Sequence, residues 1–75
     1  MKTEYKYIRF VLAEQKPKTS VYFCINRKGG DNLGRVEWYG SWRQYCFMPM
    51  EDTVFSASCL KDIQNFILEL AGGVY

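Results

Sequence analysis

Alternating apolar and polar positions dominate the first two thirds of the chain, and a helical spacing replaces them near its end. A period of two places every second side chain on the same face of a strand, so the alternation predicts β-strands. These are expected over residues 5–12, 20–26, 33–39 and 42–48. After Pro49 the apolar residues recur at helical spacing as one stripe. The stripe consists of Leu60, Ile63, Phe66, Ile67 and Leu70.

The order of these elements predicts the fold class. An antiparallel sheet of three to four strands in the order β-β-β-β-α would lay one face against the single C-terminal amphipathic helix. Ser56 is the expected N-cap of the helix, with Ser58 as a rival, and Gly72-Gly73 is the expected end. The sequence therefore predicts one α+β domain that spans residues 1–75.

The dipeptide Gly40-Ser41 suits a two-residue hairpin turn with glycine in the first turn position. Such a turn would place Tyr39 opposite Trp42 and Val36 opposite Tyr45, and directly opposite residues share a face. One face would then carry the apolar residues Val36, Trp38, Tyr45 and Phe47, with Arg43 at its solvent end. We expect these residues to lie under the helix.

The loop at residues 27–32 sets the register of the preceding hairpin. If this loop is the whole connection, Asn26 pairs with Leu33 and Phe23 lies opposite Val36. The covered face would then be apolar throughout. Its expected members are Ile8, Phe10, Leu12, Val21, Phe23, Ile25, Val36, Trp38, Tyr45 and Phe47.

The opposite face of the sheet is left without a covering helix. It is expected to hold Tyr22, Cys24, Arg35, Glu37, Tyr39, Trp42, Gln44 and Cys46, together with Tyr5, Tyr7 and Arg9. Tyrosine, tryptophan and arginine are the residue types that anchor protein interfaces. Cross-strand stacking that only stiffens a small sheet explains the same residues. The binding candidates are Tyr22, Arg27, Lys28, Arg35, Tyr39, Trp42, Arg43 and Gln44.

Charge is distributed unevenly along the sequence, although the net charge is only +2. Residues 1–43 contain nine Lys and Arg against four Asp and Glu, whereas residues 44–75 contain one lysine against four acids. This asymmetry could steer an anionic partner to the first part of the chain, or it could be an ordinary solvated surface.

The inventory of reactive side chains excludes several kinds of chemistry. The chain has no histidine and its three cysteines have no CxxC spacing, so no zinc site and no Ser-His or Cys-His nucleophile is expected. Glu37 is the only carboxylate among the polar groups of the open face, which argues against an enzyme. An odd number of cysteines without a signal peptide predicts free thiols in a cytoplasmic protein. No long apolar run is present, so no membrane span is expected. No metal and no cofactor are expected either.

Three binding functions stay open from these residues. Base stacking on the aromatic face and phosphate contacts from the basic loop 27–30 would suit a nucleic acid, although the net charge is small and Glu37 opposes phosphate. Aromatic and arginine side chains that fill pockets on a protein partner explain the same face. A small anionic ligand held by Arg35, Arg43, Tyr39 and Trp42 is the third possibility. The oligomeric state is open, and a homodimer is one option.

The stretch Leu33–Phe47, followed by 53–56 and 59–63, resembles a family of short proteins encoded in viral, prophage and other mobile-element genomes. Its core is Trp-Tyr-Gly-x-Trp-Arg-Gln-Tyr, at residues 38–45, and family members often have proline where this chain has Ser41. The resemblance implies a cytoplasmic protein of phage or mobile-element type. It carries over no catalytic residue, and it favours a host-directed binding or counter-defence role above metabolism.

Overall fold

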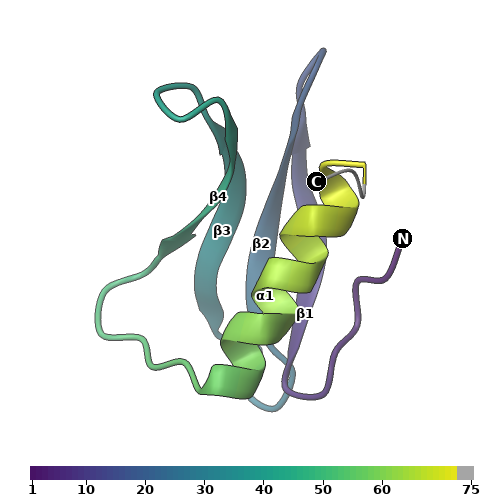
Figure 1. Ribbon diagram of the computed structural model, residues 1–75. Helices are drawn as coiled ribbons and strands as arrows, with labels where there is room; N and C mark the ends of the chain where they lie inside the picture. Colours follow the sequence, from purple (N-terminus) through teal and green to yellow (C-terminus); the bar gives the residue numbers. More distant parts are fainter. Residues whose placement is uncertain (73–75) are drawn as a thin grey trace.

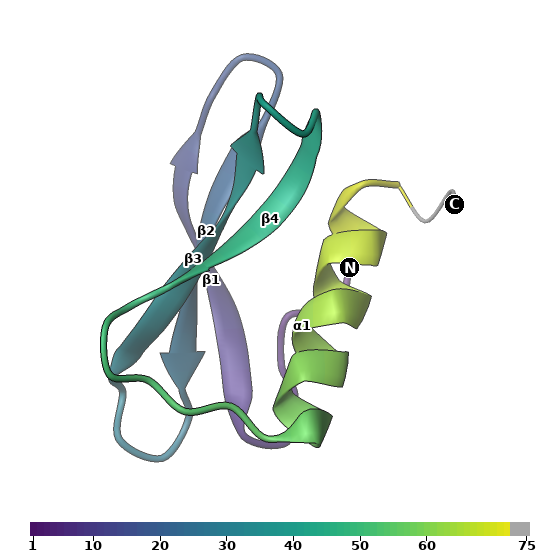
Figure 2. The same cartoon turned by 60° about the vertical axis from the view of Figure 1, so that its left-hand side comes forward.

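A computed structural model describes residues 1–72 and shows a sheet with one helix on one of its faces (Figures 1 and 2). The elements are β1 (Ile8–Gln15), β2 (Ser20–Asn26), β3 (Asn32–Tyr39), β4 (Gln44–Pro49) and α1 (Ala57–Leu70). The strands are antiparallel and lie in the order β1-β2-β3-β4. The predicted α+β fold with the element order β-β-β-β-α is confirmed.

Helix α1 begins where the capping pattern predicts. Ser56 is the N-cap, and its hydroxyl accepts a hydrogen bond from the backbone N–H of Cys59 at 3.2 Å. Ser58, the rival cap, lies inside the helix, and its hydroxyl is 3.0 Å from that of Ser56. Gly72 follows the helix with a φ of 99°, which glycine adopts readily. Gly73, the other expected terminator, lies outside the described residues.

The core forms where Phe66 of α1 meets the sheet. Its ring stacks on Phe10 with the centroids 3.9 Å apart and meets Tyr22 edge-on at 5.1 Å. Cys24 lies opposite Phe10 on one side and Gly34 on the other, and it is fully buried. The Phe66 ring therefore fills the space between Phe10 and Tyr22, in the same buried cluster as Cys24.

The N-terminal segment turns back along β1 and does not extend it. The N–H of Phe10 donates to the carbonyl of Thr3 at 2.8 Å, and the N–H of Tyr5 donates to the carbonyl of Ile8 at 2.9 Å. Tyr5 is buried and packs edge-on against Phe10. The prediction that residues 5–7 belong to the first strand, with Tyr5 on the open face, is therefore wrong.

The register between β2 and β3 differs from the prediction by one residue. Tyr22 pairs with Val36 and Phe23 with Arg35, because a bulge between Cys24 and Ile25 shifts the pairing. A shift of one residue moves every side chain of a strand to the other face. The expected placement of β2 is thus wrong: Tyr22 and Cys24 face the helix, whereas Val21, Phe23 and Ile25 face away.

Gly34 makes this bulge possible. Its φ is 155°, which L side chains rarely adopt, and its N–H donates to the side-chain oxygen of Asn32 at 2.9 Å. A Cβ at this position would lie 2.7 Å from both the Phe47 ring and the carbonyl oxygen of Met48. The backbone here runs directly beneath the Phe47 ring, and only glycine fits there.

The connection from β3 to β4 is longer than the predicted two-residue turn. Tyr39 pairs with Gln44 and Trp38 with Tyr45, so four residues, 40–43, form the loop. The pairing on β4 therefore shifts by two residues, which keeps each side chain on its face. The predicted grouping of Val36, Trp38, Tyr45 and Phe47 is confirmed. Arg43 lies in the loop and not on the covered face, so that part of the prediction is wrong.

The helix does not reach the end of the sheet that carries the β1–β2 and β3–β4 turns (Figure 1). Leu12 and Trp38 are on the helix side but are 54% and 42% exposed, so their expected burial in the core is wrong. Pairing between β2 and β3 stops at Tyr22 and Val36, and the two hairpins diverge beyond that point. The Tyr45 hydroxyl still joins them, because it accepts from the N–H of Ser20 at 3.1 Å.

Candidate functional site

A row of four side chains crosses the face that α1 leaves uncovered. Val11 pairs with Phe23, Phe23 with Arg35, and Arg35 with Met48, so all four lie on one face. Phe23 is 37% exposed, and Val11 and Met48 are half-buried. We call these four residues the open-face row. It is more aliphatic than the aromatic and arginine surface that the sequence predicted.

A polar bridge lies beside this row. The Glu37 carboxylate accepts from Arg35 Nε at 2.7 Å and from Lys16 Nζ at 3.4 Å. Lys16 belongs to the turn after β1 and Glu37 to β3, so their ion pair crosses over β2. The bridge thus lies across the strand that carries Val21, which is buried on this face although no helix covers it. The Arg35 hydrogen bond and then Lys16 lower the pKa of Glu37, while burial opposes this.

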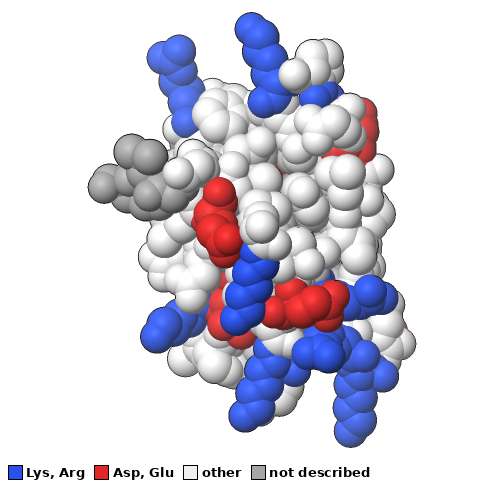
Figure 3. Space-filling model, turned by 90° about the vertical axis from the view of Figure 1, so that its right-hand side faces the viewer, with Lys and Arg blue, Asp and Glu red and all other residues white. Residues whose placement is uncertain are grey.

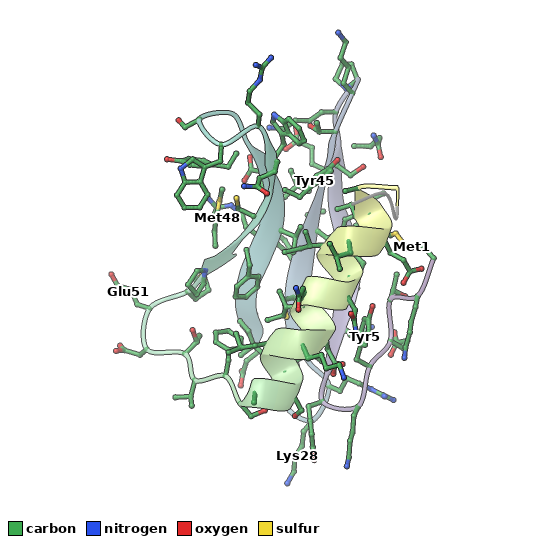
Figure 4. All side chains as sticks on the ribbon, viewed as in Figure 1. Met1, Tyr5, Lys28, Tyr45, Met48 and Glu51 are labelled. Carbon is green, nitrogen blue, oxygen red and sulfur yellow. The ribbon has the colours of Figure 1, made fainter. Side chains whose placement is uncertain are left out.

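A hollow of about 220 Å³ continues the open-face row at the free edge of β4. It is lined by Tyr39, Trp42, Cys46, Phe47 and Met48. Met48 lies on the side of β4 away from the helix, whereas Tyr45 lies toward it (Figure 4). Trp42 is 66% exposed and meets Tyr39 edge-on at 5.2 Å. The row and the hollow therefore form one mainly apolar surface that shares Met48.

The β3–β4 turn presents Trp42 and Arg43 at the end of this surface. The carbonyl oxygen of Tyr39 accepts from the N–H of Trp42 at 3.2 Å and from the N–H of Arg43 at 2.9 Å. Arg43 has a φ of 54°, in the left-handed region that costs a residue with a Cβ about 1–2 kcal/mol. The turn therefore keeps arginine where glycine would be less strained. The next residue, Gln44, is exposed at the start of β4.

Arg27 and Lys28 lie at the other end of the sheet, where Figure 4 shows Lys28. They line an open hollow of about 340 Å³ together with Lys6, Tyr7 and Asn26. The length of β3, eight residues or roughly 25 Å, separates this end from the β3–β4 turn. The structure thus divides the predicted binding residues. Tyr39, Trp42, Arg43 and Gln44 lie together at the β3–β4 turn, and Arg35 lies four residues before Tyr39 on the same face of β3. Arg27 and Lys28 lie apart from them, and Tyr22 is on the helix side.

The residues that sequence reasoning missed are Val11, Phe23 and Met48. The sequence predicts Phe23 in the core, because its alternation with Val21 and Ile25 suits a covered face equally well. A signal was present, since β2 is apolar on both of its alternating faces and a single helix covers only one.

The uneven charge along the sequence does not give one basic and one acidic pole. On the side of the molecule shown in Figure 3, Lys and Arg project mainly at the two ends, and Asp and Glu lie mostly between them. Basic loops therefore mark both ends of the sheet, while the open-face row itself carries one arginine, whose guanidinium is paired with Glu37.

The thiols and carboxylates limit the chemistry of the described residues. Cys24, Cys46 and Cys59 are free thiols, and burial, followed by the nearby Cys59, raises the pKa of Cys24 to about 12. Residues 1–72 contain no cluster of three or more His, Cys, Asp or Glu side chains placed to share a metal ion. Within the same residues, no helix has the length and hydropathy that a membrane span requires.

Comparison with known proteins finds one relevant similarity. The chain is 30% identical over 66 residues to the "Uncharacterized 9.3 kDa protein" of Acholeplasma phage L2, and the match covers 87% of this chain and 85% of that protein. No family model and no solved structure matches the chain. The predicted resemblance to short phage-type proteins is therefore supported, while the eight-residue core as a signature of that family stays a prediction.

Proposed function

This chain belongs to the family of the uncharacterized 9.3 kDa protein of Acholeplasma phage L2, and from that premise we propose that it is a non-enzymatic binding protein of phage or mobile-element origin. It engages a host protein through the open-face row and the adjoining Trp42 hollow, as an inhibitor or in counter-defence. It acts in the cytoplasm, where its three free thiols would stay reduced.

The observation that carries this proposal is the apolar character of the uncovered face. A sheet normally buries its apolar face against a second layer, but Phe23 and Met48 lie on the side without a helix. Beside them, Trp42 stands largely exposed at a hollow. Aromatic side chains next to concave apolar surface are typical anchors of protein–protein interfaces.

The geometry favours a protein above a nucleic acid on this face. Arg35 is the only cation in the open-face row, and its Nε is already bound to the Glu37 carboxylate at 2.7 Å. The basic loop 27–30, which a nucleic-acid module would combine with the face, lies at the opposite end of the sheet. A partner that offers apolar side chains to Phe23 and Met48 suits this surface better than a phosphate backbone does.

Affinity purification from host cells with matched variants tests the proposal. Trp42→Ala and Phe23→Gln should each weaken capture of the partner at least tenfold, because truncating an interface anchor costs about 2 kcal/mol or more. Leu60→Gln is the control, since Leu60 is an exposed apolar residue on the helix. Circular dichroism should show that all variants fold.

The outcomes separate the alternatives. A protein that the wild type and Leu60→Gln retain, and that Trp42→Ala and Phe23→Gln lose, supports the proposal. Capture that disappears after nuclease treatment contradicts it. A dimer in sedimentation equilibrium that Phe23→Gln dissociates would show that a second copy, and not a host protein, occupies the face.

A further inference from the structure

The hollow at the loop end of the sheet is lined by hydrogen-bond donors. Lys6, Arg27 and Lys28 contribute cationic groups, and Tyr7 and Asn26 contribute a hydroxyl and an amide. No carboxylate is among the lining residues, and the volume is about 340 Å³. Such a concave cluster of positive donors is suited to an anion with several acceptor oxygens.

Arg27 is fixed in place before any ligand arrives. Its Nη1 donates to the carbonyl oxygen of Tyr5 at 2.7 Å, and its Nε lies 3.6 Å from a carboxylate oxygen of Glu4. Its backbone N–H donates to the carbonyl oxygen of Tyr7 at 3.0 Å. The planar guanidinium is thereby anchored on one side, and Nη2 keeps donors for a ligand.

The neighbouring groups are oriented as well. Asn26 accepts the N–H of Lys28 through Oδ1 at 3.0 Å, so its amide nitrogen is left to donate. The Lys6 ammonium lies 5.2 Å from the centroid of the Tyr7 ring, and that ring is half exposed. The hollow therefore combines an anchored arginine and two lysines with a half-exposed aromatic ring.

We propose that this hollow binds a nucleotide phosphate group, with the base of the nucleotide against Tyr7. Arg27 and Lys28 contact the phosphate oxygens, and stacking on the ring supplies affinity for any base because every base has a π-face. The nucleotide can be free or part of a single strand, and the phosphate chemistry is the same in both cases. The site lies at the opposite end of the sheet from the Trp42 hollow and does not depend on the proposed protein partner.

Three probes test the site in the full-length protein by fluorescence and calorimetric titration at 50 mM and 200 mM salt. They are inorganic tripolyphosphate, ATP and a fluorescently labelled oligothymidylate of eight nucleotides. Lys28→Gln should weaken binding of all three about tenfold, because a charge-assisted hydrogen bond is lost. Lys18→Gln is the matched control, since Lys18 is an exposed lysine in the turn at the other end of the sheet. It should leave the affinities within twofold.

Tyr7→Leu separates the base from the phosphate. This substitution should weaken the binding of ATP and of the oligonucleotide about fivefold or more, and it should leave the affinity for tripolyphosphate unchanged. Tighter binding of the oligonucleotide than of ATP identifies a strand as the source of the phosphate, and the reverse identifies a free nucleotide. The proposal is overturned if no probe binds at 50 mM salt, or if Lys18→Gln weakens binding as much as Lys28→Gln. An unchanged ATP affinity in Tyr7→Leu overturns the stacking.

Discussion

Two neighbouring rows of the same sheet face opposite sides of the protein, and they pack in different ways. The covered row, Phe10–Cys24–Gly34–Pro49, has its smallest residues in the middle, where Cys24 is fully buried and the Phe47 ring lies over Gly34. The open-face row, Val11–Phe23–Arg35–Met48, has large side chains at the equivalent positions. The pairing of a strand with its neighbours decides which of its two alternating sets of side chains meets the helix.

The difference shows why the less apolar side of β2 lies beneath the helix. Tyr22 and Cys24 are less apolar than Phe23 and its neighbours, but Tyr22 meets the Phe66 ring edge-on and Cys24 is fully buried in the same cluster. Close packing of one large aromatic ring against small residues is worth more than the added area of a side that does not fit it. The larger apolar set is then left on the open face.

The largest expected effect comes from removing the side chain that fills the covered face. Phe66→Ala should destabilise the protein by about 3–5 kcal/mol, because it leaves a cavity between Phe10 and Tyr22. The equivalent truncation on the open face, Phe23→Ala, should cost about 1 kcal/mol or less, because Phe23 is part exposed. Urea unfolding monitored by tryptophan fluorescence measures both.

Phe66→Leu keeps the comparison measurable if the alanine variant does not fold at all. Its loss of stability should lie between those of Phe66→Ala and Phe23→Ala, since leucine fills part of the space of the phenylalanine ring. Equal losses of stability for Phe66→Leu and Phe23→Ala would show that the two faces of the sheet are packed alike.

The second prediction concerns the β2–β3 bulge, which decides which side chains of β2 face the helix. Gly34→Ala should destabilise the protein by about 2–3 kcal/mol, because it combines left-handed backbone strain with a Cβ placed against the Phe47 ring. Gly40→Ala is the control, since a Cβ at Gly40 would have no other atom within 4 Å. If both glycine variants lose the same stability, the close approach at Gly34 does not hold the register.

The sequence predicts the fold class, the position of the helix and the faces of β3 and β4. The faces were correct although the turn was not, because the real loop shifts the pairing by two residues and so preserves which side chains lie together. The N-cap at Ser56 was equally predictable, since capping depends on residues that are close in sequence.

The face of β2 could not be predicted, and the candidate site changed as a result. Val21, Phe23 and Ile25 fit a covered strand as well as Tyr22 and Cys24 do, so the alternation alone does not choose between them. The choice depends on Phe66, more than forty residues away, and on the bulge at Gly34. Such long-range packing has no signal in local periodicity.

The smallest expected effect concerns the polar bridge beside the open-face row. The Arg35 hydrogen bond, with Lys16 in support, holds the pKa of Glu37 below its ordinary value of 4.5. A carboxylate with a lowered pKa stabilises the fold above its unfolded pKa, and this contribution is lost as the pH falls through its folded pKa. Glu37→Gln should therefore cost about 0.5–1 kcal/mol at pH 7, as expected for partly exposed ion pairs.

The same reasoning predicts that the difference in the free energy of unfolding between Glu37→Gln and the wild type shrinks from pH 7 to pH 3, because the wild-type carboxylate takes up a proton as the pH falls toward and through its lowered pKa. Urea unfolding at the two pH values measures this. Glu51→Gln, in the exposed loop after β4 (Figure 4), should change stability by less than about 0.3 kcal/mol at either pH. If the free energy of unfolding of Glu37→Gln differs from that of the wild type as much at pH 3 as at pH 7, the side chain stabilises Val21 and β2 by packing rather than by charge. The polar bridge would then be a small second layer on a face that is otherwise open.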